Sequence, residues 1–295
     1  MCGRYAATAR PDQLVEEFEA EDRTAEPARS ILAAPQVPPR GAPDFNLAPT
    51  KQAPVVLTRP ARARDVGAAP AGGGDFSDSQ PGGEPARQLR LLTWGLVPGW
   101  AKDVKVGVRM INARAESVLE KPAFARAATA RRALVPARGW YEWQKSPTAT
   151  DGRGRPRRQP FFTERVDGDV VAFAGLYEFW RDPAVADGED PDAWLTTFAV
   201  LTTAAEPGLD RIHDRQPLVL DRQYWAPWLD PTLVDRDRVA GLLAPHPPGR
   251  FTAYPVSRAV SSNRANGPHL LDPAPQEDLV GVVDPATGEL LGAAR

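Results

Sequence analysis

The middle of the chain contains short, β-rich apolar segments that follow one another without regular intervening helices. This pattern constrains the fold most, because a doubly wound parallel sheet needs a helix after nearly every strand. Helical patterns occur only at residues 11–20, 122–132, 221–229 and 234–243. The sequence therefore predicts an α+β fold. The expected strands lie at 53–58, 89–96, 133–136, 139–144, 160–164, 170–178, 197–203 and 250–256.

The length of 295 residues allows one elaborated domain or two small ones, and we favour one domain with insertions. Residues 59–88 contain two glycine clusters and hardly a large apolar side chain, which predicts a disordered insertion. Residues 144–160 are expected to form a long basic hairpin loop. The domain is expected to span residues 2–272, followed by a C-terminal tail at 273–295.

Several classes of protein are excluded or disfavoured by composition. Cys2 is the only cysteine, so no internal disulfide can form. The first thirty residues lack a signal-like apolar run, and no segment approaches the ~18–20 apolar residues that cross a bilayer. One cysteine and three dispersed histidines give no metal-ligand spacing, and no phosphate-binding loop or dinucleotide motif is present. We therefore expect a cytoplasmic protein with neither a metal nor a cofactor.

The net charge of −2 is unevenly distributed. Residues 12–26 contain seven acids against Arg23, a net of −6, whereas residues 101–138 contain nine bases against three acids, a net of +6. Such a basic stretch can build a local phosphate-binding face on an otherwise acidic protein. The alternative, a solvated helix face with scattered arginines, stays open from charge alone.

Cys2 directly follows the initiator methionine. Removal of Met1 would give Cys2 a free α-amine beside its thiol, with pKa values near about 8 and about 8.5. Such a 1,2-aminothiol condenses with aldehydes, because the imine formed by the amine is closed by the sulfur into a thiazolidine. The alternative is that Cys2 is incidental to a flexible terminus.

Two further residues are candidates for proton transfer. Glu142 lies among the aromatic residues of Gly139-Trp140-Tyr141-Glu142-Trp143, where desolvation would raise its pKa toward neutrality. His213 follows the expected strand at 197–203. The alternatives are that Glu142 points to solvent and that His213 is a structural hydrogen-bonding residue.

Tryptophans and bases follow one another in the run Trp94–Lys102, which leads to Ile111–Glu116. Aromatic rings beside glycine and proline turns favour stacking on unpaired nucleobases, while arginines hold phosphates. Tryptophan is also an ordinary core residue, so this pattern alone leaves both interpretations open.

As a set, these segments resemble the SRAP family, the SOS-response-associated peptidases or abasic-site-processing proteins. The resemblance is collinear over residues 2 to about 220 and is specific as a whole, although each piece alone is weak. It rests on Met-Cys-Gly-Arg-Tyr at 1–5, Phe45–Thr50, Trp94–Lys102, Ile111–Glu116, Lys121–Phe124, Arg131–Ala137, Gly139–Trp143, Phe173–Glu178, Leu201–Ala204 and Ile212–Pro217.

The resemblance implies a single α+β domain with a mixed, partly open barrel-like sheet and peripheral helices. It also implies a DNA-damage-response protein, a monomer, that cross-links itself covalently to an abasic site in single-stranded DNA and so shields the lesion. Self-removal of Met1 and weak lyase activity are further expectations. The family positions imply Cys2, Asn112, Glu142 and His213 as catalytic residues. The implied DNA-binding residues are Arg4, Asn46, Trp94, Trp100, Arg114, Arg126, Thr202 and Arg215.

Two departures from the family pattern lie near these positions. Gln216 stands where methionine is usual, which could alter packing near His213, and Ala125 stands where arginine is common. Arg126 is expected to take over that phosphate contact.

Two rival functions remain from the sequence. A class II glutamine amidotransferase also uses a mature N-terminal cysteine, but its Arg-Gly-Pro-Asp and His-Asn-Gly-Glu segments are absent. A non-covalent single-stranded DNA-binding protein would use Trp94, Trp100 and the arginines, with Cys2 incidental.

Overall fold

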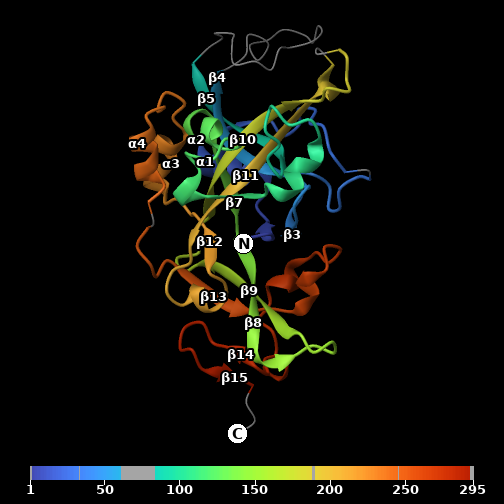
Figure 1. The fold of residues 1–295 in the computed structure, drawn as a ribbon, viewed down its shortest axis with the longest axis vertical. Helices are drawn as coiled ribbons and strands as arrows, with labels where there is room; N and C mark the ends of the chain where they lie inside the picture. Colours follow the sequence, from blue (N-terminus) through green and yellow to red (C-terminus); the bar gives the residue numbers. More distant parts are fainter. Residues whose placement is uncertain (1, 33, 61–83, 188–189, 245, 293–295) are drawn as a thin grey trace.

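A ring of five strands forms the core of the upper half of the molecule as drawn in Figure 1. The fold is that of a computed structural model, which describes residues 2–32, 34–60, 84–187, 190–244 and 246–292. The ring consists of β4 (Gln52–Pro60), β5 (Pro85–Trp94), β7 (Arg132–Ala137), β10 (Val171–Arg181) and β11 (Trp194–Ala204).

The ring is closed by a short parallel pairing between β5 and β11. Thr93 lies opposite Thr197, and Trp94 lies opposite Phe198. All other neighbours in the ring pair antiparallel. Because no strand of the ring is left as an edge at this seam, the sheet is a small closed barrel.

The barrel strands are buried on both faces. Val55 points into the barrel with Val135 and Phe173, whereas Val56 points outward with Leu134. This alternation follows from the two-residue period of a strand. The interior cluster fills the barrel, and the outer cluster packs under the helices.

Four helices cover the outer face of the barrel (Figure 1). The apolar spacing of Leu14 and Phe18 turns both side chains inward, and Phe18 stacks on Trp225 with ring centroids 4.4 Å apart. The predicted helix at 122–132 is shorter than expected, because β7 takes over at Arg132. The helices are α1 (Pro11–Phe18), α2 (Ala125–Ala130), α3 (Arg222–Leu229) and α4 (Arg236–Leu242).

A second sheet extends from one end of the barrel in the order β13-β9-β8-β1-β3. The chain passes almost directly from β7 in the barrel into β8 in this sheet. The amino terminus lies between the two parts in Figure 1. The strands are β1 (Tyr5–Ala7), β3 (Asp44–Leu47), β8 (Gly139–Thr150), β9 (Pro156–Arg165) and β13 (Phe251–Pro255).

Shorter elements complete the described fold. The remaining strands are β2 (Glu21–Asp22), β6 (Asn112–Arg114), β12 (Arg215–Pro217), β14 (Val282–Val283) and β15 (Leu290–Leu291). The 3-10 helices are η2 (Val104–Arg109), η3 (Ala115–Ser117), η4 (Pro191–Ala193), η5 (Leu209–Arg211), η6 (Arg258–Ser261), η7 (Pro268–Leu271) and η8 (Gln276–Asp278).

The predicted α+β fold with a barrel-like sheet is confirmed, but two expected loops differ from the structure. β4 continues to Pro60 and β5 begins at Pro85, so the ends of the expected insertion at 59–88 are paired strand; its residues 61–83 lie outside the described residues. Most of the expected loop at 144–160 is also strand, because β8 and β9 pair from Gln144 opposite Gln159 to Thr150 opposite Pro156. Pairing satisfies the backbone polar groups that a long loop would leave to water.

The C-terminal stretch packs against the second sheet. Ser146 of β8 donates a hydrogen bond to the Gly281 carbonyl at 2.6 Å, and the Val282 side chain is buried in the interior cluster. The expected tail at 273–295 is therefore folded over its described part, residues 273–292.

Candidate active site

Cys2 lies in the interior cluster at the end of the barrel nearest the second sheet. Its side chain is fully buried, and its Sγ lies 3.8 Å from the Arg4 carbonyl, to which the thiol donates. The Tyr5 ring, three residues on, packs edge-on against Trp94 and Phe173 with centroids 5.1 and 5.6 Å away. Burial raises the pKa of the Cys2 thiol, and the charge of Glu142 raises it further. The thiol therefore needs a base before it can attack.

Glu142 supplies a carboxyl group suited to that task. It lies on β8, and only 5% of its surface is exposed. Burial raises the pKa of Glu142 to about 7, and the negative charge of Asp214 contributes to the increase. Near neutral pH the group is present in both protonation states, so it can accept one proton and donate another. The predicted desolvation of Glu142 is confirmed.

Asn112 joins the barrel wall to the N-terminal strand. It lies on β6, beside Val200 of β11, and its Nδ2 donates to the Cys2 carbonyl at 2.6 Å. Its Oδ1 is buried and has no hydrogen-bond partner among the described residues. The backbone of Cys2 is thereby fixed, and one buried acceptor stays available next to it.

His213 lies in the loop between η5 and β12. The Arg215 N–H donates to His213 Nδ1 at 3.1 Å, so the neutral ring carries its proton on Nε2. Asp214 Oδ1 lies 2.9 Å from the same Nδ1, a contact that becomes a hydrogen bond only when the ring is protonated there. Burial lowers the pKa of His213, the positive charges of the amino terminus and of Lys145 add to the lowering, and Asp214 opposes it. A neutral imidazole is thus favoured.

Part of the basic segment is exposed, as a DNA-binding surface requires. Trp100 is 65% exposed in the loop after β5, and Arg114 is exposed on β6, on the same face of the strand as Asn112. The exposed rim, as we call this surface, comprises Trp100, Lys102, Lys105, Arg109 and Arg114.

Arg215 is placed beside this rim but is already engaged. Its guanidinium binds both carboxylate oxygens of Glu116 at 2.7 and 2.9 Å, and it donates to the Thr202 carbonyl at 2.6 Å. The register of β11 also sets Thr202 beside Arg114. Sequence reasoning missed the role of Glu116, although its charge two residues after the candidate phosphate-binding Arg114 was visible in the motif 111–116.

Three predicted groove residues are buried and line no surface. Trp94 lies inside the barrel, where its Nε1 donates to the Ile111 carbonyl at 2.9 Å. Asn46 accepts from Arg4 at 2.7 Å and donates to carbonyls of the segment 260–265, so both side chains brace that segment. Thr202 is covered by Arg215. The expectation that Asn46, Trp94 and Thr202 contact DNA directly is corrected by this burial.

Arg126 is exposed on α2, and no contact described in the structure links it to Cys2. Gln216, the departure from the family pattern near His213, is buried, and its Oε1 accepts from the Glu206 N–H at 2.9 Å. It therefore fixes the start of the loop that carries His213.

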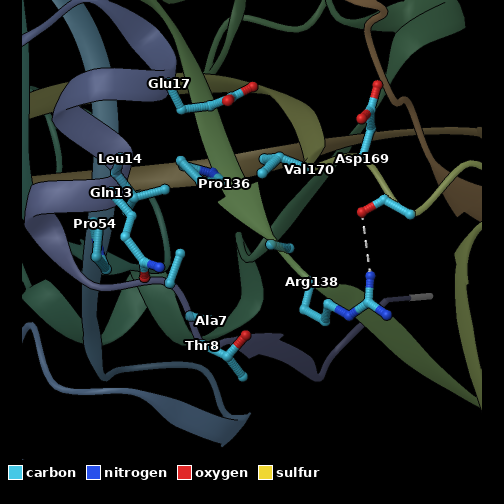
Figure 2. A pocket seen from close by; sticks show the side chains of 13 residues that line it. Ala7, Thr8, Gln13, Leu14, Glu17, Pro54, Pro136, Arg138, Asp169 and Val170 are labelled. Atoms are coloured by element: carbon cyan, nitrogen blue, oxygen red, sulfur yellow. Dashed lines mark hydrogen bonds between the residues drawn. The ribbon is translucent and has the colours of Figure 1, made fainter.

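A separate pocket of about 360 Å³ lies between α1 and the barrel. Figure 2 shows Gln13 and Glu17 of α1 on one side of it and Arg138 and Asp169 on the other. None of Cys2, Asn112, Glu142 or His213 lines it. It is thus distinct from the candidate site.

Two features are absent from the described residues. None of their helices has the length and apolar content that spanning a membrane requires. The same residues contain no group of three or more His, Cys, Asp or Glu side chains placed to hold a metal ion.

The sequence model of the SOS response associated peptidase (SRAP) family matches residues 1–263. The chain belongs to this family.

Among curated proteins, the abasic site processing protein YoqW of Bacillus subtilis is 31% identical over 92% of this chain and 99% of its own length. The abasic site processing protein HMCES of the mouse is 28% identical over 93% of this chain and 76% of its own. A crystal structure of a Bacteroides thetaiotaomicron protein covers 92% of this chain at a TM-score of 0.66 and 21% identity, which shows the shared fold.

Proposed function

We propose that this protein processes abasic sites by forming a thiazolidine cross-link between Cys2 and the ring-opened sugar in single-stranded DNA. The proposal rests on the burial of Cys2 beside a carboxyl group whose pKa is raised to about 7, with Asn112 holding the Cys2 backbone at 2.6 Å. The names of the relatives, which are abasic site processing proteins, support the substrate.

The first step joins the Cys2 amine, freed by removal of Met1, to the sugar aldehyde. The nitrogen lone pair attacks C1′, and the carbinolamine loses its hydroxyl as water to give an imine. Protonated Glu142 gives the proton that this departing hydroxyl needs. Asn112 Oδ1, a buried acceptor without a partner among the described residues, is available to orient the amine or a sugar hydroxyl.

The second step closes the ring. The imine formed in the first step carries a proton on its nitrogen. Glu142, now a carboxylate, takes the proton of the thiol, the sulfur forms a bond to the imine carbon, and the C=N π pair returns to the nitrogen, which keeps its proton. The raised pKa of the thiol makes this assistance necessary. No atom leaves in this step, so the product is a stable five-membered thiazolidine.

His213 has a separate role before the imine forms. The closed sugar must open before it presents an aldehyde, which requires proton transfer at the ring oxygen. A neutral imidazole with its proton on Nε2 can carry out this transfer. If the imine instead loses a proton at C2′, the 3′ phosphate leaves by β-elimination, which accounts for the expected weak lyase activity.

The exposed rim would hold the strand. Trp100 offers a face for base stacking, and Lys102, Lys105, Arg109 and Arg114 offer charges for phosphates. Arg215, held in place by Glu116, and Arg4, held in place by Asn46, would each contribute a fixed positive group near the strand.

Intact mass spectrometry tests the proposal, with and without an oligonucleotide that carries one abasic site. We expect loss of Met1, followed by an adduct that forms without borohydride and maps to Cys2. The Cys2→Ala variant keeps an α-amine but lacks the thiol, so its adduct should be trapped only by borohydride. A parent protein that lacks Met1 yet stays unmodified contradicts the proposal and favours reversible single-strand binding.

The same samples test the finer enzymatic claims. Self-removal of Met1 predicts that Glu142→Gln, which cannot take up a proton, retains more Met1 than the parent. Lyase activity predicts that a small fraction of the DNA strand is cleaved. Because cleavage proceeds from the imine, conditions that prevent imine formation should also abolish it. If Met1 is removed equally from both proteins, a host peptidase rather than this chain performs the cleavage.

A further inference from the structure

The loop that carries His213 is hydrogen-bonded to the C-terminal segment, residues 279–291, through Arg211. This segment lies beyond the 1–263 match to the family. Val283 of that segment accepts and donates hydrogen bonds with one buried side chain, Gln144 of β8. Arg211, two residues before His213, donates to the Pro285 carbonyl at 2.6 Å. The segment therefore contacts both the strand of Glu142 and the loop of His213.

Gln144 links these three parts of the chain. Its Nε2 donates to the Arg211 carbonyl at 3.2 Å and to the Val283 carbonyl at 2.9 Å, and its Oε1 accepts from the Val283 N–H at 2.8 Å. Only 2% of Gln144 is exposed. Gln144 and Glu142 are two residues apart on β8, so they lie on one face of the strand. Gln144, which lies on the same strand face as Glu142, thus holds the loop that carries His213.

The segment itself is rigidly seated. Gly281 has a φ of +75°, and a Cβ there would lie 2.7 Å from both Ser146 Oγ and the Ala149 Cβ. Leu279 and Val282 are buried in the cluster that also contains Cys2. A turn held by Asp284, whose side chain accepts from the Ala286 N–H at 2.7 Å, presents the Pro285 carbonyl to Arg211. The grip on the loop is therefore supported by core packing.

We propose that the C-terminal segment positions His213 relative to Glu142 and Cys2, and that Gln144 and Arg211 are the positioning residues that transmit this constraint. The inference rests on the role of His213 in the proposed function. Proton transfer depends on sub-ångström placement, and a shift of about 1 Å can cost about a hundredfold in rate. Among the described residues, the loop has the backbone bonds of η5 and of Ala205 to Asp214. Its middle is tied to β8 directly by Gln144 and, through Arg211, by the C-terminal segment that Gln144 also binds.

Arg211→Ala and Gln144→Met test the proposal, and Gln159→Met is the matched control. Gln159 lies opposite Gln144 in the β8–β9 register, is equally buried, and donates to the Val256 carbonyl instead of the His213 loop. The readouts are the rate of borohydride-independent cross-linking across pH and the NMR titration of the His213 ring. The chain has only three histidines, so a His213→Asn spectrum assigns its signal.

We expect both test variants to slow cross-linking by at least about tenfold. The pKa of His213, lowered by burial in the parent, should move up toward its ordinary value, because a released loop admits water. The charged groups that act on the ring are the amino terminus, Asp214 of its loop and Lys145 of β8, and neither variant changes them. Arg211→Lys should restore most of the rate, since it keeps a donor for the Pro285 carbonyl. Gln159→Met should lower thermal stability and leave the cross-linking rate and the pKa of His213 unchanged.

The proposal is overturned if Arg211→Ala and Gln144→Met leave the His213 titration and the cross-linking rate within about twofold of the parent. Arg211 is exposed, so its variant carries the test should Gln144→Met fail to fold. A moved titration with an unchanged rate supports the positioning and refutes the role of His213 in the proposed function. The NMR readout uses no DNA, so the positioning is tested even if the parent forms no cross-link.

Discussion

The residues around Cys2 and the exposed rim differ in how their side chains are held. Cys2 and Glu142 are held by burial, and the half-buried Asn112 is held by a short hydrogen bond to the Cys2 carbonyl, whereas Trp100 and the bases of the rim extend into solvent. Chemistry that depends on shifted pKa values needs the first environment. Contact with a flexible, sequence-variable strand needs the second.

In the proposed function, this difference would make reaction and strand binding separable. Removing a buried side chain should alter the fold or the reaction, while removing a rim side chain should alter only affinity. The sharpest pair is Trp94 and Trp100, which belong to one short motif and lie on opposite sides of this division.

The largest effect is expected for Trp94→Ala. Loss of a fully buried ring inside the barrel should lower the free energy of unfolding by about 3–5 kcal/mol. Urea unfolding measures this, and Trp94→Phe, which keeps an aromatic ring, should lose less. Unchanged stability together with weakened DNA binding would place Trp94 with the rim instead.

Glu142→Gln should come next, with an effect that depends on pH. The pKa of Glu142 is raised from 4.5 to about 7 by burial, so the folded state favours the proton. The parent should therefore lose on the order of 3 kcal/mol of stability relative to the variant as pH rises through that interval. Urea unfolding at pH 5 and pH 8 measures it. The exposed Glu120→Gln is the control, and parallel pH curves for parent and Glu142→Gln would contradict the assignment.

Trp100→Ala should weaken binding of undamaged single-stranded DNA by about 1–3 kcal/mol, because one base loses its stacking partner. Its thermal midpoint should match that of the parent, since the ring is 65% exposed. Fluorescence anisotropy gives the affinity. Val108, which is also exposed in this segment but has no π face, supplies the control Val108→Ala. Equal losses in both variants would mean that apolar area, not stacking, holds the strand.

Arg114→Gln should have the smallest effect. One lost phosphate contact should reduce the slope of log K against log salt by about 0.7 for a single strand. Anisotropy titrations at several salt concentrations measure the slope. Arg222→Gln, on α3 beside Glu17, serves as the control. A slope that does not change would remove Arg114 from the rim, and the same experiment on Arg126→Gln decides the predicted contact of that residue.

Local patterns predicted most of the fold, because helix and strand periods are read over a few residues. The helices at Leu14 and Phe18 and at Trp225 were predicted close to their bounds. The sequence did not predict which strands close the barrel, because the closing pair, Trp94 and Phe198, lies far apart in the chain. Where a basic, glycine-containing stretch suggested a loop, pairing between Gln144 and Gln159 extended the strands.

The candidate site was predicted unevenly. The sequence predicted Cys2, Glu142 and Asn112 as site residues; Cys2 and Glu142 are buried, and Asn112 is half-buried and hydrogen-bonded to Cys2. The sequence could not separate Trp94 from Trp100, because burial is set by tertiary packing and not by residue type. Gln144 had no motif around it, and its partners Arg211 and Val283 become neighbours only in the folded chain.

The register of β4 and β5 brings the far ends of the two strands next to each other. Because the two strands stay paired until Pro60 meets Pro85, the chain leaves and re-enters the sheet at adjacent positions. The closure entropy of a connection between such adjacent ends changes slowly with its length, by about 2 kcal/mol between a long loop and a tight turn. Figure 1 places this end of the hairpin away from the amino terminus. A fluorophore, an affinity tag or a second module inserted at this end of the hairpin would therefore lie far from Cys2.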